Sequence, residues 1–564
     1  MIAPRQLLSF LTYFGLLLGL SLPLQAQQRE GILHLRDRVH QFLIYQHTQG
    51  HLPYAFLSHQ PLSAYEANRY LDSIYMHLEE LSPAEQRELM RLKGAQPGPG
   101  VSWAHRLLSF TYPDGENFIA IRTPDYAVAI NPLLYLSAGK AFQHTPSEQS
   151  TRTTWQNTRG VQVSGHLGSH LFFEARVEEN QTVLPLLASP LFAQRLLAPF
   201  SRDFLPEGGW DYWRVTGMIG VRGKFIEARF GRNRNQWGYG LGSLILSDFA
   251  PAYDQLQIRT TFWRFQFTNL YALTTDTHRR STSTVDYAAH APRFIAMHRL
   301  AFQMHRRFKM GFFEAVVLDP ASFSSELQLL WTFMNPVIFY RAADLGLRSP
   351  GNMLIGLDTY WRFKNGIAWY NQLVLDEFKI TELTSNRGWW ANKWGILTGL
   401  HLTRLPIPLT ELWIEYSRIR PYTYSSRSTT LAYVHYNGGL GYPTGPNTQN
   451  VALKLTSHPI PRWHGALLIL YTQRGRNSED QNFGSDPYQP YDTRIGDYGI
   501  RFLQGIRQNQ WLIEARLGME LLPRMYLEAA LRAEHLSDEE LGTSQYINPF
   551  LLLRWGLPFQ SLRF

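Results

Sequence analysis

Apolar and polar residues alternate along most of this chain, and this period of two constrains the fold more than any other feature. In the stretch 511–521, WLIEARLGMEL, apolar residues occupy every second position and charged residues such as Glu514 and Arg516 lie between them. The stretch 525–534, MYLEAALRAE, repeats the pattern. From about Phe118 onward, roughly eighteen such segments of about ten residues can be marked out. Strands of this length, apolar on one face and polar on the other, are typical of a transmembrane β-barrel.

The connections between these segments alternate in length. The turn at Asn365-Gly366 is short because both residues tolerate positive φ, as a tight hairpin requires. Equally short breaks occur at 168–169 and 222–224 and near Trp263 and Arg307. Between them lie long connections, predicted at 179–213, 232–254, 274–293, 319–352, 379–392, 419–448 and 474–493. Outer-membrane barrels have short periplasmic turns and long extracellular loops, so this pattern favours such a barrel over the alternative, a soluble β-rich protein.

The alternation fails at one place in the predicted pattern. The turn at 522–524 follows another break near 507–509, with no long connection between the two. The predicted number of antiparallel strands, about eighteen, is therefore defined only to within about two.

The first 26 residues have the pattern of a secretory signal peptide. Arg5 precedes an apolar run from Leu7 to Leu22, and Leu24-Gln25-Ala26 forms a cleavage site before Gln27. The alternative is an N-terminal membrane anchor. No later stretch contains the ~18 consecutive apolar residues of a membrane helix. The absence of cysteine excludes disulfides and thiolate metal sites.

Residues 27–117 are predicted to form a small helical region and linker on the periplasmic side of the barrel, which spans 118–564. Apolar residues from Ile32 to Leu43 recur at helical spacing, and Gly50 ends that segment. Ser63 and Glu66 predict a capping box for a second helix. A third helix is expected to start at Ser82-Pro83 and to end at Gly94. The C-terminal Phe564 agrees with a barrel, because outer-membrane proteins commonly end in an aromatic residue.

The loop 231–257, GRNRNQWGYGLGSLILSDFAPAYDQLQ, combines glycines, arginines and aromatic rings. A phosphate-binding loop would lie between a strand and a helix, but no helical pattern follows these glycines. Arg232 and Arg234 could bind carboxylates of a ligand, while Trp237 and Tyr239 offer faces for sugar rings. The alternative is a loop that packs inside the barrel as a plug, with its arginines paired to Asp248 and Asp254.

Two further loops are candidates for polysaccharide binding. Trp389 and Trp390 could form a stacking surface, although an interfacial aromatic girdle is the commoner use of such residues in barrels, and the alternative is therefore a girdle or internal packing. The loop 418–447 is rich in aromatic and basic residues and is the best candidate for binding an acidic glycan, with a structural role as the alternative. Its candidate residues are Arg420, Tyr422, Tyr424, Tyr433, His435 and Tyr436.

Catalytic motifs are weak in this sequence. It has no Gly-x-Ser-x-Gly elbow, no His-Glu-x-x-His pair and no Asp-rich calcium loop. Asp376, Glu377 and Glu382 cluster after a strand, as glycosidase carboxylates do, but a solvated or ion-paired patch is the commoner use. We therefore expect no enzyme, no cofactor, no metal site and no nucleic-acid partner.

Several stretches resemble the Wzi-like capsule-assembly family, most closely the versions found in Bacteroidota-type bacteria. They include the loop above, HQPLSAYEANRYLDSI near the N-terminus and FMNPVIFYRAADLGLRSPGNMLIGLD at 333–358, followed by LDEFKITEL, GWWANKWG and RPYTYS. The resemblance implies an outer-membrane barrel, surrounded by outer-membrane lipid, that binds or organises exported capsular polysaccharide. A diffusion or substrate channel and a part in surface adhesion or gliding motility are the alternative functions.

Overall fold

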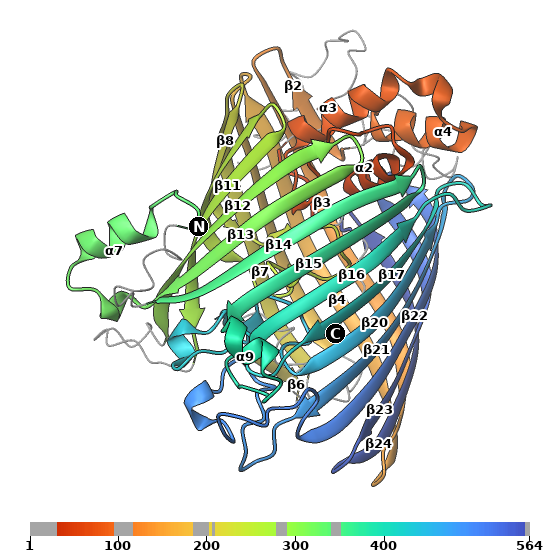
Figure 1. Ribbon diagram of the computed structural model, residues 1–564. Helices are drawn as coiled ribbons and strands as arrows, with labels where there is room; N and C mark the ends of the chain where they lie inside the picture. The colour runs from red at the N-terminus through yellow and green to blue at the C-terminus, as the bar shows by residue number, and fades with distance from the viewer. Residues whose placement is uncertain are drawn as a thin grey trace, which may run out of the picture.

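The computed structural model of the 564-residue chain describes residues 31–35, 37–94, 117–183, 202–205, 209–277, 290–339 and 351–558. In this part of the chain the main structure is a closed barrel of eighteen long antiparallel strands, which confirms the predicted fold (Figure 1). The strands are β3 (Tyr126–His144), β4 (Gln149–Leu167), β5 (Leu171–Val183), β7 (Gly209–Arg222), β8 (Ile226–Asn233), β10 (Tyr253–Phe262), β11 (Phe265–Asp276), β12 (Ala291–His305), β13 (Phe308–Leu318), β14 (Gly351–Lys364), β15 (Ile367–Glu377), β16 (Lys393–Leu402), β17 (Thr410–Ile419), β20 (Thr448–Ser457), β21 (Trp463–Arg476), β22 (Ile506–Leu522), β23 (Met525–Asp538) and β24 (Gly542–Trp555). The predicted signal peptide, residues 1–26, lies outside the described residues.

Each long strand pairs with the next one along the chain, and β24 closes the barrel on β3, with Leu551 opposite Ala138. Two short strands extend this sheet, β2 against β3 and β6 against β7. Two further pairs of short strands form separate small sheets, β1 with β9 and β18 with β19. The bounds are β1 (His59–Gln60), β2 (Ile119–Arg122), β6 (Arg202–Leu205), β9 (Gln236–Trp237), β18 (Val434–His435) and β19 (Gly438–Gly439).

The alternation of residues places apolar side chains on the outer wall and charged side chains in the lumen. On β22, Trp511 and Leu517 are 45% and 56% exposed on the outside. Glu514 and Arg516 face inward, are buried and form an ion pair of 2.9 Å. Similar pairs lie elsewhere in the lumen, including Arg532–Glu534, Arg554–Glu528 and Arg299–Asp358, each with a shortest distance of 2.7 Å. Pairing is needed because removal of an unpartnered charge from water is costly.

The long connections lie at one end of the barrel, although that end also has the short turns 145–148 and 539–541. Apart from the break near 507–509, the short turns predicted from the sequence are found at the other end, which we call the short-turn end, and Gly366 has the positive φ of 88° expected there. All seven predicted long connections lie between strands at the opposite, long-loop end. One prediction was wrong. Residues 507–509 are part of β22 and not a turn, so the preceding long connection spans 477–505. The alternation of lengths fails one strand later, where the short turn 539–541 follows the short turn 523–524.

Three helices lie at the short-turn end, in red and orange in Figure 1: α2 (Arg38–Gln49), α3 (Ala64–Tyr75) and α4 (Pro83–Leu92). As predicted, α2 ends at Gly50, which has φ of 112°, although it starts only after the N-cap Asp37. Ser82 and Glu85 form a full capping box for α4. The predicted box of α3 is only half present. Ser63 accepts from the Glu66 amide, whereas the Glu66 carboxylate pairs with Arg259 of the barrel at 2.8 Å.

The helix α2 is anchored within the short-turn end of the barrel. The Thr48 hydroxyl lies 2.9 Å from both the Tyr360 hydroxyl and His401 Nδ1 of the wall. The Thr48 carbonyl accepts a bond of 2.8 Å from the amide of Gly366, and Arg362 donates to the His47 carbonyl at 3.0 Å. Both faces of α2 are largely buried as a result, so the helical region, which is too small to form a core alone, shares the core of the barrel.

Shorter helices lie between strands or between helices. They are η1 (Leu78–Glu80), η2 (Pro320–Ser322), α7 (Glu326–Phe333), α9 (Ile380–Thr384), η4 (Thr429–Leu431) and η5 (Tyr491–Thr493). Within the described ranges, no helix combines the length and the apolar character needed to cross a bilayer.

Candidate functional site

The loop 234–252 between β8 and β10, which we call the first lumen loop, enters the barrel. Trp237 and residues 244–246 are fully buried. The short strand β9 in this loop pairs with β1 of the helical region, with His59 opposite Trp237, and the Gly238 amide donates to the Ser58 carbonyl at 2.6 Å. A loop that starts at the long-loop end therefore reaches the helices anchored at the other end.

Polar residues of the barrel wall satisfy the backbone of the first lumen loop. The Glu415 carboxylate accepts from the amides of Leu241 and Gly242 at 2.7 and 3.1 Å. The side-chain oxygen of Gln372 accepts from the Leu244 amide at 2.8 Å. Because buried amides need acceptors, these wall residues allow an irregular loop to lie inside the barrel.

The loop 420–447 between β17 and β20, the second lumen loop, packs against the first. The hydroxyls of Tyr424 and Tyr433 donate to the carbonyls of Leu244 and Ile245 at 2.8 and 2.7 Å. His435 Nδ1 accepts from the Thr275 amide at 3.1 Å, and burial lowers the pKa of this histidine to about 3. The two loops thus form one packed body in the lumen.

This packing places six of the candidate residues inside the lumen. They have at most 5% of their surface exposed, so their rings offer no free face to a sugar: Trp237, Tyr239, Tyr422, Tyr424, Tyr433 and His435. Arg232 forms two bonds of 2.8 Å to Asp254, and Arg234 donates to the Asp248 carbonyl at 3.2 Å. The contacts of the first lumen loop therefore match the alternative in which this loop packs inside the barrel as a plug.

Trp389 and Trp390 are two candidates that lie partly exposed at the long-loop end. They follow α9 in the β15–β16 connection, and their rings are 6.3 Å apart. Trp390 packs 4.6 Å from the ring of Tyr491, which belongs to the β21–β22 connection, and the Arg494 guanidinium lies 4.4 Å above the Trp390 ring. These contacts join two connections, so the two tryptophans do not belong to an aromatic girdle on the strands.

Tyr498 extends this group of rings. It is 48% exposed and lies 4.7 Å from the Arg387 guanidinium. We call Trp389, Trp390, Tyr491 and Tyr498 the aromatic surface. Sequence reasoning missed both tyrosines, because the segment YDTRIGDYG was treated only as part of a long connection. Tyrosine recurring beside arginine and glycine in that segment was the available signal.

The remaining candidates, Arg420 and Tyr436, lie at the same end. Arg420 directly follows β17, and its amide donates to the Trp394 carbonyl at 2.9 Å. Its Nε and Nη2 are buried and have no hydrogen-bond partner among the described residues. Burial and the neighbouring Arg418 lower the pKa of Arg420. Tyr436 is partly exposed, and its carbonyl accepts from the Tyr488 hydroxyl at 2.9 Å.

The described residues contain no group of three or more histidine, aspartate or glutamate side chains placed to hold a metal ion. Asp376 and Glu377, which could have suggested a glycosidase, contact Lys393 at 3.1 and 3.3 Å. Glu382 pairs with Arg387 at 2.8 Å. The cluster is an ion-paired group.

Comparison with known proteins adds a family assignment. Residues 158–545 match the family described as capsule assembly protein Wzi. The chain belongs to the Wzi family. Because this match covers most of the barrel, the resemblance of the sequence motifs is confirmed, and the fold and the family identify the chain as an outer-membrane β-barrel.

Solved structures agree with the Wzi assignment at the level of the fold. Wzi of Escherichia coli, described as a carbohydrate-binding β-barrel involved in group 1 capsule assembly, has a TM-score of 0.55 and 13% identity, with 94% of this chain and 100% of that chain covered. OpdL and OprD of Pseudomonas aeruginosa reach TM-scores of only 0.40 and 0.41, with 10% and 9% identity, over 76% and 77% of this chain and 98% and 94% of theirs. No curated protein sequence matches the chain significantly.

Proposed function

We propose that this chain is a non-enzymatic outer-membrane protein that binds capsular or surface polysaccharide at its long-loop end. Membership of the Wzi family supports this proposal, as does the description of the E. coli relative as a carbohydrate-binding barrel. The family also favours polysaccharide handling over a part in adhesion or gliding.

The observation that carries the proposal is the aromatic surface. Its four rings come from two separate connections and lie partly exposed, next to the guanidinium groups of Arg387 and Arg494. A flat apolar ring with a polar group at its edge suits a sugar, which has an apolar face and hydroxyls around its rim. Two rings in contact present a larger platform than one, and connections fixed on a rigid barrel are typical positions for binding residues.

The packed body in the lumen favours a binding protein over a channel. Both lumen loops and the helical region pack into one core with the barrel wall, and the residues of this core are at most 8% exposed. A diffusion channel needs a continuous aqueous path, which such packing opposes.

We propose an acidic polysaccharide because of Arg420. Arg387 and Arg494 of the aromatic surface already have carboxylate partners, Glu382 and Asp497. Two nitrogens of Arg420 have no hydrogen-bond partner among the described residues, and its guanidinium could bind the carboxylate of an acidic sugar. The aromatic surface would then bind sugar faces, while Arg420 would favour acidic glycans.

The outer wall is proposed to contact outer-membrane lipid directly. Near the short-turn end, the rings of Trp361, Phe363 and Trp369 form a cluster on this wall, with centroids 4.3 to 6.4 Å apart. All three are at least 36% exposed. Aromatic residues commonly form girdles at the level of the lipid headgroups.

The decisive experiment compares two double variants of the full chain. Trp389→Ala with Trp390→Ala removes half of the aromatic surface, whereas Trp263→Ala with Trp331→Ala removes two exposed tryptophans outside it. We expect only the first variant to lose binding of the purified protein to surface polysaccharide from its host, by about tenfold or more. Heat-modifiable gel migration checks that both barrels fold. Equal glycan binding by both variants would contradict the proposal.

A further inference from the structure

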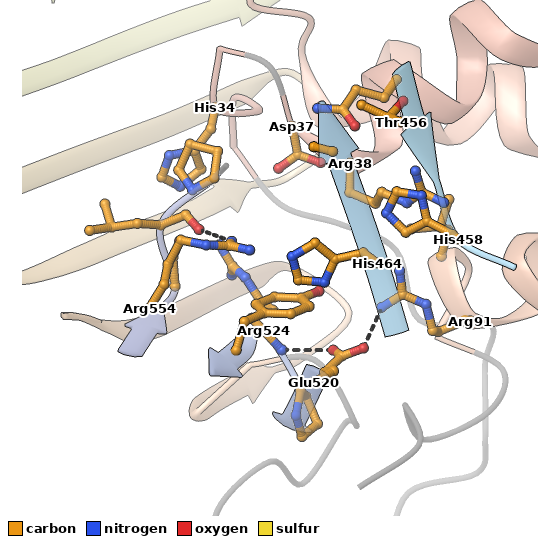
Figure 2. Close-up of a pocket in the computed structure, with 18 of the residues that line it drawn as sticks. His34, Asp37, Arg38, Arg91, Thr456, His458, His464, Glu520, Arg524 and Arg554 are labelled. Atoms are coloured by element: carbon orange, nitrogen blue, oxygen red, sulfur yellow. Dashed lines mark hydrogen bonds and ion pairs between the residues drawn. The ribbon is translucent and has the colours of Figure 1, made fainter. Parts of the chain in front are cut away.

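A cavity of about 120 Å³ lies near the short-turn end, separate from the aromatic surface. It is enclosed by α2 and α4 of the helical region and by strands and turns of the wall from β20 to β24. Figure 2 shows His34 on one side of this space and His458 on the other, with His464 and Arg524 between them. The volume is enough for several water molecules or one small ion.

Basic side chains predominate in the lining of the cavity. Most of them already have carboxylate partners: Arg38 and Arg91 pair with Glu88, and Arg554 pairs with Glu528. Arg524 differs from these. Its guanidinium donates to the Gly556 carbonyl at 3.1 Å and contacts no carboxylate among the residues that the structure describes. The positive charge of Arg524 at the cavity is therefore not paired with a carboxylate of the described residues.

Three histidines add nitrogen atoms that lack partners. The Nδ1 atoms of His34, His458 and His464 are buried and have no hydrogen-bond partner within the described ranges. His34 and His464 are only 4% and 7% exposed. Buried polar atoms are normally satisfied, so several orphaned nitrogens around one cavity suggest that a ligand completes them.

The carboxylates in the lining are engaged elsewhere. Asp37 caps α2 by accepting from the Val39 amide at 2.8 Å. Glu520 accepts from the Arg524 amide and contacts Arg91 at 3.5 Å. Neither carboxylate contacts the guanidinium of Arg524, so an anion could approach that group.

We propose that this cavity is an oxyanion site, in which Arg524 and the three histidines bind a sulfate, phosphate or carboxylate group. A guanidinium matches the geometry of two oxygens, and each histidine, once protonated, can donate one further bond from Nδ1. The site is independent of the proposed polysaccharide binding at the other end.

Binding at this site should be coupled to proton uptake. Burial, and then Arg176 and Arg524, hold the pKa of His34 well below its ordinary value. Burial and Arg38 do the same for His458. An anion offsets these positive charges and therefore favours protonated histidines. The other groups that face these three histidines are Gln162, Glu88, Arg91, Glu528 and Tyr526.

The test uses the full chain in detergent and sulfate as the probe, because sulfate keeps its charge between about pH 5 and 8 while histidines titrate. Calorimetric titration should show one saturable site, with tighter binding at about pH 6 than at about pH 7.5. Arg524→Gln should weaken binding about tenfold or more. The control Arg307→Gln, which changes an exposed arginine at the same end, should bind like the unmodified chain.

Gel migration checks folding, and His34→Asn is the second variant should Arg524→Gln fail to fold. His34→Asn should keep sulfate binding but reduce the pH dependence of that binding. Separate titrations with inorganic phosphate and glucuronate would show whether the natural oxyanion belongs to a phosphate or to an acidic sugar. Absence of saturable sulfate binding at both pH values, or equal binding by Arg524→Gln, would overturn the proposal.

Discussion

Trp237→Ala should release the first lumen loop while the barrel stays intact. Trp237 is fully buried where β9 meets β1, and its ring lies 5.9 Å from that of Phe313. Its backbone is held by the Leu246 carbonyl at 2.9 Å and by the side chain of Gln372 at 3.1 Å. The indole therefore contributes a side-chain contact between the loop and the interior of the wall at this point.

The cost of this substitution can be estimated from the burial. Replacing a buried tryptophan with alanine costs about 3–5 kcal/mol. The indole N–H has no hydrogen-bond partner in the described part of the chain, so its removal relieves an unsatisfied donor and places the cost near the lower limit. A loss of about 3 kcal/mol would raise the population of the open loop about 10²-fold.

Hydrogen exchange measures this population directly. In Trp237→Ala, the amides of residues 241–246 should exchange about 10²-fold faster, whereas amides of the barrel strands should keep their rates. Trp263→Ala, at an exposed turn, is the control and should change neither. Planar-bilayer conductance should increase only in Trp237→Ala. Unchanged exchange of the loop amides in that variant would refute the view that Trp237 holds the loop in the lumen.

Four further outcomes are expected. Binding to an acidic polysaccharide should weaken but persist as salt rises, because charge is screened beyond about 8 Å while ring stacking is not; loss of all binding in high salt would contradict the aromatic surface. Arg420→Gln should bind a neutral glycan normally and an acidic glycan more weakly, in a direct binding assay. A tag after Met76, an 81% exposed residue, should be labelled only in permeabilised cells, and labelling on intact cells would show that the helical region is not periplasmic. Burial lowers the pKa of His435 to about 3, whereas in the open loop this pKa is near 6.5, so between these pH values the open loop binds more protons than the packed loop. Acidification to pH 5 should therefore destabilise the loop packing by about 2 kcal/mol. Hydrogen exchange of the loop amides should become faster at pH 5, and His435→Gln should abolish this acceleration.

The barrel could be predicted because its evidence is local. Alternation along a strand and turn residues such as Asn365-Gly366 need no knowledge of distant contacts, and they gave the strand number and the order of short and long connections. The error at 507–509 arose because Arg507 and Asn509 resemble turn residues, whereas here they belong to β22 and pair with β21.

The candidate site was harder to predict because exposure depends on distant residues. Trp237 and Trp390 both lie in loops rich in glycine, arginine and aromatic residues. The first meets Gln372 and His59 inside the lumen, while the second lies beside the connection that contains Tyr491. Composition cannot separate these cases. Only pairings between segments more than 90 residues apart decide which ring is buried and which can meet a ligand.

The pairing of β24 with β3 has a consequence for the order of biogenesis. This seam joins the last strand of the barrel to its first long strand, so the wall cannot close until almost the whole chain has been delivered. The helical region precedes β3 and ends up bonded to residues as distant as His401. Contacts of such sequence separation form late and slowly, since a large loop must close first. The helices can therefore complete their packing only after the wall has formed, because residues of the wall supply part of their core.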